Sequence, residues 1–293
     1  MKIACALFLV LFNSSTIRAD DTQGPSYHWG RGYHIPAANL TLGGYLKGAY
    51  NYFGSEGQAL SLEDLSFFIS WRPFNRLRFF SELELEDLFS LEGVRPFDES
   101  FRVERLYVDV LATDSLTLRL GQYLTPFSRW SLLHAAPLVW TSSRPLVTEG
   151  YLVSHHGTGL EVLYRTDWLG RELNVSLFAD DSKDLEIGFH INPFIYAFGT
   201  RLTYQVHRTL NIGSSYLVSK VNSGGQSNWH YSIAMDFLWQ KQQYEVQLES
   251  LLNLRTNQGS QYGFYLQSVA PLLENLFVVG RYEYMFDSDL KQF

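Results

Sequence analysis

Apolar and polar residues alternate with a period of two along most of this chain. In one clear segment, Tyr231, Ile233 and Met235 alternate with Ser232 and Asp236. Such alternation is typical of β-strands whose two faces meet different surroundings. Repeated segments of about ten residues, apolar on one face and charged or small on the other, are the signature of a transmembrane barrel. A soluble β-sandwich also alternates, so the period alone leaves both folds open.

The alternation predicts about thirteen strands separated by turn residues. They lie near residues 40–53, 60–72, 76–88, 101–111, 115–123, 159–166, 172–180, 195–206, 209–219, 229–240, 242–254, 260–270 and 274–286.

Three features favour a membrane barrel over a sandwich. Aromatic residues such as Tyr50, Trp71, Trp239 and Tyr282 gather at strand ends, as the aromatic girdles at a membrane interface require. Charged residues recur on the polar faces, which suits a wet interior. Short and long connections also alternate. The predicted fold class is therefore all-β, a transmembrane antiparallel β-barrel over residues 39–293.

The connection lengths predict the orientation of the barrel. Links after even-numbered strands are short, and several links after odd-numbered strands are long; the longest covers residues 124–158. Barrels of this kind have short periplasmic turns and longer extracellular loops. We therefore expect the chain to enter from the periplasm, and we expect loop 124–158 to start on the outer side and fold inward to narrow a pore.

The predicted number of strands is odd, which indicates that one strand has not been counted or is missing. Bacterial single-chain barrels have an even number of strands, whereas the pattern gives thirteen and leaves only residues 287–293 after the last one. Either the count is short by one, or the sequence is a truncated piece of a longer barrel, so the expected number is 13–16.

The N-terminus predicts export. Within residues 1–19, Lys2 supplies a positive start, residues 3–12 an apolar core, and residues 17–19 a cleavage site, as in a signal peptide. An apolar stretch this short is unsuited to anchoring in a bilayer, and Cys5 lies before it, unlike the cysteine of a lipoprotein. Residues 20–38 read as a polar periplasmic lead-in without clear periodicity.

Composition agrees with an exported membrane protein. Aromatic residues make up 16% of the 293 residues and charged residues only 18%, which suggests many side chains facing an apolar medium. The net charge of −7 becomes −9 once Lys2 and Arg18 are removed, so nothing indicates a nucleic-acid partner. No run of 18 apolar residues predicts a transmembrane helix. The expected location is the outer membrane of a Gram-negative-type bacterium.

Charged residues on the polar faces of the predicted strands are candidates for the pore lining, and they form a basic set and an acidic set. The basic set is Lys47, Arg72, Arg78, Arg105, Arg119, Arg165, Arg201 and Arg281, and the acidic set is Glu82, Glu84, Glu86, Asp109, Glu161, Asp236, Glu245, Glu249 and Glu283. A basic ladder opposite an acidic one would set up a field across the pore that favours polar solutes. The alternative is that these charges pair across neighbouring strands.

The long loop supplies candidates for solute contact at a constriction. They are Arg129, His134, Arg144, His155 and His156. The adjacent histidines lack a spaced partner or a nearby carboxylate cluster, so no metal site is predicted from them. The carboxylates at positions 82, 84 and 86 would suit Ca²⁺, although a solvated lumen face explains them as well. No cofactor is predicted.

Three stretches carry a family resemblance. Residues 118–128 (LRLGQYLTPFS), 140–147 (WTSSRPLV) and 156–160 (HGTGL) resemble the strand-to-loop signature of the phosphate-selective porin O and P family. The resemblance implies a homotrimeric outer-membrane channel of about sixteen strands, in contact with outer-membrane lipid, that passes small polar or anionic solutes by passive diffusion. The long loop would form its constriction. Because that loop contains Arg129 and Arg144 but no lysine, phosphate selectivity is not implied.

Two other functions remain alternatives. A barrel enzyme of the lipase type would need a nucleophilic serine with a positioned base, and the sequence has no Gly-x-Ser-x-Gly elbow, so we do not expect an enzyme. A structural barrel with a plugged interior would not conduct ions. Single-channel conductance and a lipase assay distinguish these alternatives from a porin.

Overall fold

The computed structural model describes residues 24–28, 30–52, 58–90, 93–94, 100–133, 135, 138–141, 143–148, 153–181, 194–223, 226–256 and 258–288. The predicted signal peptide and the candidate His134 lie outside these residues.

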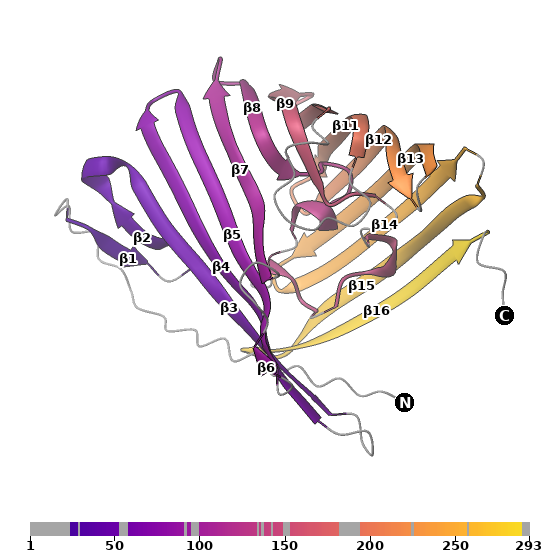
Figure 1. The fold of residues 1–293 in the computed structure, drawn as a ribbon, viewed down its shortest axis with the longest axis horizontal. Helices are drawn as coiled ribbons and strands as arrows, with labels where there is room; N and C mark the ends of the chain where they lie inside the picture. Colours follow the sequence, from indigo (N-terminus) through magenta and orange to yellow (C-terminus); the bar gives the residue numbers. More distant parts are fainter. Residues whose placement is uncertain are drawn as a thin grey trace. The chain divides into compact units, whose positions relative to one another are not determined.

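Thirteen long strands make up most of the described chain (Figure 1). They are β3 (Leu40–Tyr52), β4 (Gln58–Phe74), β5 (Leu77–Ser90), β7 (Phe101–Leu111), β8 (Leu116–Leu124), β9 (His156–Trp168), β10 (Arg171–Asp180), β11 (Phe194–His207), β12 (Leu210–Ser223), β13 (Gln226–Lys241), β14 (Tyr244–Arg255), β15 (Ser260–Leu273) and β16 (Leu276–Asp287). All thirteen predicted strands are confirmed, with each end within four residues of its expected position.

Three short strands were not predicted: β1 (Ser26–His28), β2 (Gly32–Ile35) and β6 (Gly93–Val94). Strand β1 pairs with β2, β2 pairs with β3, and β6 pairs with β5. The lead-in thus contains a hairpin followed by the one-turn 3₁₀ helix η1 (Pro36–Ala38). Strands of two to four residues are too short to show a period in the sequence.

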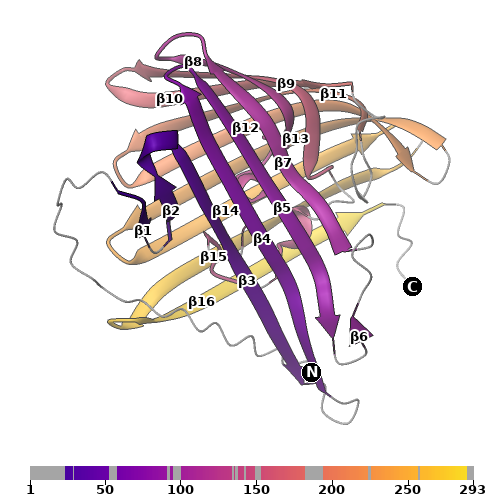
Figure 2. The ribbon, with the colours of Figure 1, turned by 60° about the vertical axis from the view of Figure 1, so that its left-hand side comes forward.

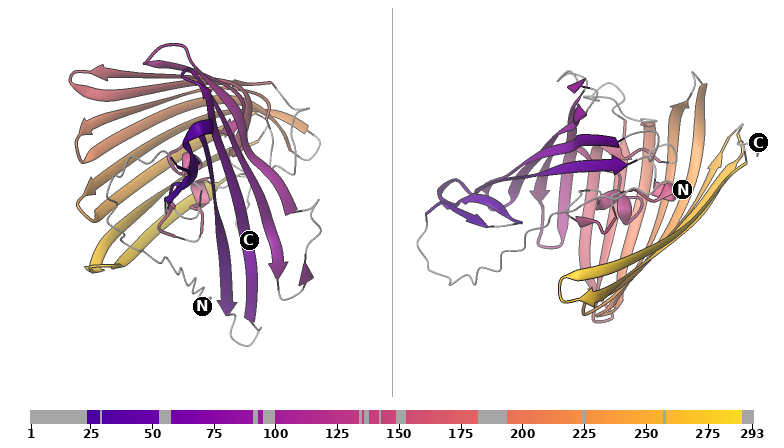
Figure 3. Two further views of the ribbon diagram at one scale, coloured as in Figure 1. Left: turned by 90° about the vertical axis from the view of Figure 1, so that its left-hand side faces the viewer. Right: turned by 90° about the horizontal axis from the view of Figure 1, so that it is seen from below.

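Each strand pairs antiparallel with a sequence neighbour in the order β1-β2-β3-β4-β5-β7-β8 and onward to β16, with β6 beside β5. Short turns close the hairpins β4–β5, β7–β8, β9–β10, β11–β12, β13–β14 and β15–β16, as predicted. The chain forms two compact units, Met1–Leu106 and Tyr107–Phe293, so that β7 begins in the first and ends in the second. Figure 2 shows β3, β4 and β5 as neighbours in the first unit, and Figure 3 shows the orange and yellow hairpins of the second.

The sheet exposes its apolar face and buries its polar one. On β13, Tyr231, Ile233 and Met235 are exposed, whereas Ser232 and Ala234 between them and Asp236 after them are buried. The same inversion holds in the first unit, where exposed Leu65 and Phe67 flank the buried Ser66. A soluble sandwich would bury its apolar face instead, so the side-chain pattern favours the membrane barrel. Among the described residues, no helix is long and apolar enough to cross a membrane.

Candidate constriction segment

The longest link of the second unit joins β8 to β9 and is called here the β8–β9 segment, residues 125–155. Its described part contains two one-turn 3₁₀ helices, η3 (Trp130–Leu132) and η5 (Leu146–Thr148). The amide nitrogen of Thr125 donates a hydrogen bond to the carbonyl oxygen of His155 over 2.8 Å. This bond closes the base of the segment, so both of its ends leave the sheet at the same place.

Two residues of the sheet, Tyr123 and Gly159, determine the packing at the base of the segment. Tyr123, at the end of β8, is fully buried, and its hydroxyl lies 3.2 Å from the carbonyl oxygen of Leu160 and 3.3 Å from that of Ala179. A Cβ atom at position 159 would lie 2.2 Å from the Ala179 oxygen, so only glycine allows β9 to approach β10 there. The motif that resembles a porin signature therefore fixes the point at which the segment departs.

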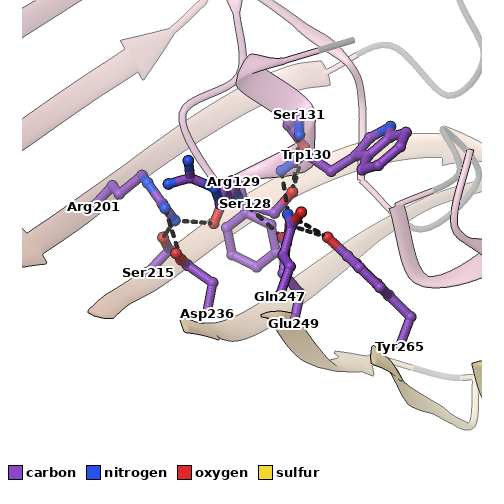
Figure 4. A network of polar contacts seen from close by, with 11 residues as sticks. Ser128, Arg129, Trp130, Ser131, Arg201, Ser215, Asp236, Gln247, Glu249 and Tyr265 are labelled. Atoms are coloured by element: carbon purple, nitrogen blue, oxygen red, sulfur yellow. Dashed lines mark hydrogen bonds and ion pairs between the residues drawn. The ribbon is translucent and has the colours of Figure 1, made fainter. Parts of the chain in front are cut away.

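A buried carboxylate holds the start of the segment (Figure 4). Glu249 on β14 accepts hydrogen bonds from the backbone amides of Arg129 (3.0 Å) and Trp130 (2.9 Å). The Tyr265 hydroxyl and the Gln247 amide donate to the same carboxylate over 2.5 and 3.0 Å. Glu249 is 2% exposed and Tyr265 is fully buried. Four donors around one carboxylate satisfy its buried charge and fix the turn that begins η3.

A second contact lies beside this carboxylate. Arg201 on β11 donates to the carbonyl oxygen of Phe127 (3.3 Å), to the Ser215 hydroxyl (3.0 Å) and to the Asp236 carboxylate (2.6 Å). Figure 4 shows Arg201, Ser215 and Asp236 on one side of the Ser128–Trp130 turn and Glu249 with Tyr265 on the other. The start of the segment is thus held by two charged groups from different strands, Arg201 on β11 and Glu249 on β14.

Strand β16 holds the later part of the segment. Arg281 donates to the Thr141 hydroxyl (2.7 Å) and to the carbonyl oxygen (2.8 Å) and hydroxyl (2.6 Å) of Ser143. Glu283 accepts a hydrogen bond of 2.6 Å from the backbone amide of Leu146. The ring centroids of Trp140 and Phe277 lie 5.0 Å apart. The segment therefore lies along the sheet of its own unit instead of extending away from it.

Glycine makes room for the second helix of the segment. A Cβ atom at Gly263 of β15 would lie 2.6 Å from the Cγ1 atom of Val147 and 2.5 Å from the carbonyl oxygen of Tyr284. Val147 is 2% exposed. The missing side chain on β15 therefore provides the space into which η5 packs.

Of the five solute-contact candidates, four have described contacts. Arg144 donates to the ring of His155 (2.9 Å) and to the carbonyl oxygen of Thr148 (3.3 Å), inside the segment itself. The rings of His155 and His156 meet edge to face with centroids 6.3 Å apart. Arg129 is held through its backbone, and its side chain is partly exposed. The structure thus brings Arg144 and His155 together, while their role toward a solute stays a prediction.

The lining candidates form pairs with their neighbours. Arg119 bonds to Asp109 (2.7 Å) and Glu161 (3.0 Å), and its guanidinium carbon lies 3.9 Å from the centroid of the Tyr107 ring. Further pairs are Lys47 with Glu63 and Asp64, Arg102 with Glu86, Arg105 with Glu82, Arg201 with Asp236, and Arg281 with Glu283. Most of these pairs correspond to the alternative in which the charges pair across neighbouring strands; Arg201 reaches Asp236 past β12, and Arg281 and Glu283 share β16.

Four further candidates differ in exposure. Arg165 is 73% exposed in its side chain and lies 3.7 Å from Glu172 next to the β9–β10 turn, while Glu245 accepts a bond from the exposed Gln240. Arg72 is exposed near the end of β4, and Arg78 is half-buried on β5. The position of a charge along its strand, which parity does not give, decides whether neighbouring strands bury it.

The carboxylates considered for calcium are also engaged. Among the described residues, one group of carboxylates, Glu84, Glu86 and Glu104, has ligand atoms within 4.8 Å of one another. Glu84 accepts hydrogen bonds from Ser66 (2.9 Å) and Tyr45 (3.3 Å), and Glu86 pairs with Arg102. Glu82, which was expected in this group, pairs with Arg105 instead. Two of the three carboxylates in this group, Glu84 and Glu86, thus already bond to side chains of the protein.

Sequence reasoning missed the roles of Gln247 and Tyr265. Glu249 was expected as a lining charge, and its contact with the backbone of residues 129–130 was not. Parity placed these side chains on the polar face, but the contact spans a sequence separation of 120 residues. No local pattern reports such a contact.

Comparison with solved structures shows the fold. An anion-selective porin from Comamonas acidovorans superimposes with a TM-score of 0.60 at 14% identity, covering 86% of this chain and 80% of that one. Salmonella typhi OmpF, in a complex with daunomycin, gives 0.61 at 11% identity over 86% and 80%. The outer membrane channel DcaP of Acinetobacter baumannii gives 0.50 at 15% identity over 88% and 82%. No protein-family model matches the chain, and no curated protein matches its sequence. The chain therefore has the fold of outer-membrane porins, as predicted.

Proposed function

We propose that this protein is an outer-membrane porin, a passive diffusion channel for small polar solutes, in which the β8–β9 segment narrows the passage. The observation that carries the proposal is the attachment of this segment to the polar face of β11–β16. Glu249, Arg201 and Arg281 all belong to that face, and each bonds to the segment. A segment fixed against the polar face of a barrel reduces the width of its water-filled interior, and pore width with lining charge sets what passes.

The side-chain pattern supports the membrane setting. Exposed apolar residues such as Leu266 and Tyr282 occupy one face of the sheet, and buried carboxylates and guanidinium groups occupy the other. In lipid, this arrangement places apolar surface against hydrocarbon and charge against water. We also propose that the protein lies in an outer membrane, assembles as a homotrimer and belongs to the phosphate-selective porin O and P family.

The pairing of charges bears on selectivity. In the described second unit, Arg119 faces both Asp109 and Glu161, and Arg201 faces Asp236. A guanidinium that already bonds to carboxylates attracts anions less than a basic ladder would. We therefore expect weak ion selectivity and no strong preference for phosphate, although the anion-selective porin shares the fold.

The test is single-channel recording of the folded protein in a planar lipid bilayer. Discrete conductance steps, with a reversal potential close to zero in a salt gradient, are the expected result. Folded protein that inserts but never conducts would contradict the proposal and favour the structural barrel. Hydrolysis of an ester lipid by the same sample, lost when its serines are blocked, would favour the lipase-like enzyme.

A further inference from the structure

A row of aromatic rings crosses the polar face of the first unit. Tyr45 on β3, Phe68 on β4 and Phe80 on β5 follow one another, with ring centroids 5.8 and 6.3 Å apart and interplanar angles of 38° and 30°. Arg105 on β7 lies over the last ring, 4.7 Å from its centroid. These four residues are called here the aromatic row. Each is partly buried, so its surface is neither fully covered nor fully open.

Strand register places the row on the polar face. Tyr45 pairs with Ser66, and Ser66 pairs with Glu84, so these three side chains point to one side of the sheet. Phe68 lies two residues from Ser66 and pairs with Glu82, which therefore shares this side. The next residue along β4, Phe67, points to the opposite face and is 45% exposed. Three aromatic rings thus occupy the face that elsewhere carries charges.

Polar groups border the rings on the same face. Glu84 accepts hydrogen bonds from Tyr45 and Ser66, and Glu82 pairs with Arg105. The row therefore combines tilted, nearly continuous ring surface with one partly exposed guanidinium donor, Arg105, while the carboxylates of Glu82 and Glu84 are buried behind it. A ligand that matches it needs flat C–H surface on one side and hydroxyl groups around its rim.

We propose that the aromatic row is a binding wall for carbohydrates, which meet both requirements. A sugar ring lays its C–H face on an aromatic ring, while its hydroxyl oxygens accept hydrogen bonds from the partly exposed guanidinium of Arg105. Inorganic anions are a poor match, because two carboxylates border the row beside one guanidinium and because ring faces are negative. The inference rests on the proposed function, since a channel makes this wall the surface along which solutes move.

The experiment measures block of the single-channel current by maltotriose added to the bath. A polyethylene glycol of equal size serves as a solute without ring faces, and L-tryptophan serves as a flat aromatic one. We expect maltotriose to block more strongly than either. Phe68→Ala should weaken maltotriose block roughly fivefold, because one stacking contact is lost. Phe68→Leu, which keeps apolar bulk in the wall, should weaken it similarly and protects the test against a folding defect.

The matched control is Phe67→Ala, the same substitution one residue away on the opposite face. It should leave the sugar block unchanged. Normal conductance with no maltotriose block, equal loss in the control, or preferential block by tryptophan would each overturn the carbohydrate assignment while leaving the porin proposal in place. Calorimetric titration of the folded protein in detergent with maltotriose separates the two proposals. Sugar binding without conductance would support the wall and overturn the channel, and the absence of both would overturn both.

Discussion

Replacing Glu249 with glutamine should loosen the β8–β9 segment without removing the side chain. In the native protein one carboxylate oxygen accepts the Arg129 amide, and the other accepts the Trp130 amide, the Tyr265 hydroxyl and the Gln247 amide. Glutamine offers one acceptor oxygen and one NH₂ donor. Whichever way it turns, at least one backbone amide of the segment then faces a donor.

The size of the effect follows from these contacts. A hydrogen bond to a charged group contributes about 1.5–3 kcal/mol, and the bonds that remain are weaker because their acceptor is neutral. Anchoring at residues 129–130 should therefore weaken by about 2–4 kcal/mol. The lower value changes the ratio of released to attached segment roughly 30-fold. The contacts to Arg201 and Arg281 persist, so the segment should loosen locally instead of detaching.

Two measurements detect this loosening. Open-channel current noise of Glu249→Gln in planar bilayers should exceed that of the native protein, and swelling of proteoliposomes should become faster for the larger solutes. Glu245→Gln is the control, because it makes the same change on β14, four residues away, where the carboxylate bonds to the exposed Gln240. If Glu249→Gln is as quiet as the native channel, or if the control is equally noisy, the anchoring argument is wrong.

Two further substitutions test the sheet itself. Arg201→Met leaves the buried Asp236 without its ion-pair partner and should lower the free energy of unfolding by about 3–5 kcal/mol in urea titrations. Adding Asp236→Leu to Arg201→Met should recover much of this loss. A double variant no more stable than the single one would contradict the ion-pair argument. Met235→Arg puts a charge near the middle of β13 on the exposed apolar face, and it should cost about 2–4 kcal/mol in lipid vesicles while Met235→Leu is nearly neutral. Equal stability of these two variants would mean that this face does not meet lipid.

Local alternation was sufficient to predict the strands. On β13 the side chains of Tyr231 and Ile233 are exposed and those of Ser232 and Ala234 are buried, so consecutive residues alone show the alternation. The turns were predictable for the same reason, because each hairpin is closed by a few residues between two alternating runs. Strands β1 and β2 were not predicted because a strand of three or four residues has no measurable period. Gly32, which allows close approach to Leu42, gives no signal without the partner strand.

The candidate site was predicted less well, because its contacts join distant parts of the chain. Parity placed Arg281 and Glu283 on the polar face, but nothing in their neighbourhood indicates that they hold residues 141–146. The aromatic row was missed for another reason. Alternation places Phe68 with Ser66 on the polar face, but the sequence does not indicate which residues of neighbouring strands lie side by side, and only the register brings Phe68 next to Phe80.

The placement of the β8–β9 segment has a consequence for the order of assembly. Every long strand pairs with the long strands before and after it along the chain, so hairpins form from local contacts at small cost in loop closure. The β8–β9 segment reaches its final position only later. Its partner Glu283 lies 137 residues beyond Leu146, and both the Glu283 and the Arg281 contacts require β16, the last described strand, to be in place. The wall is therefore built before the passage is narrowed, and an assembly intermediate that lacks its final strands has a wider opening than the finished protein.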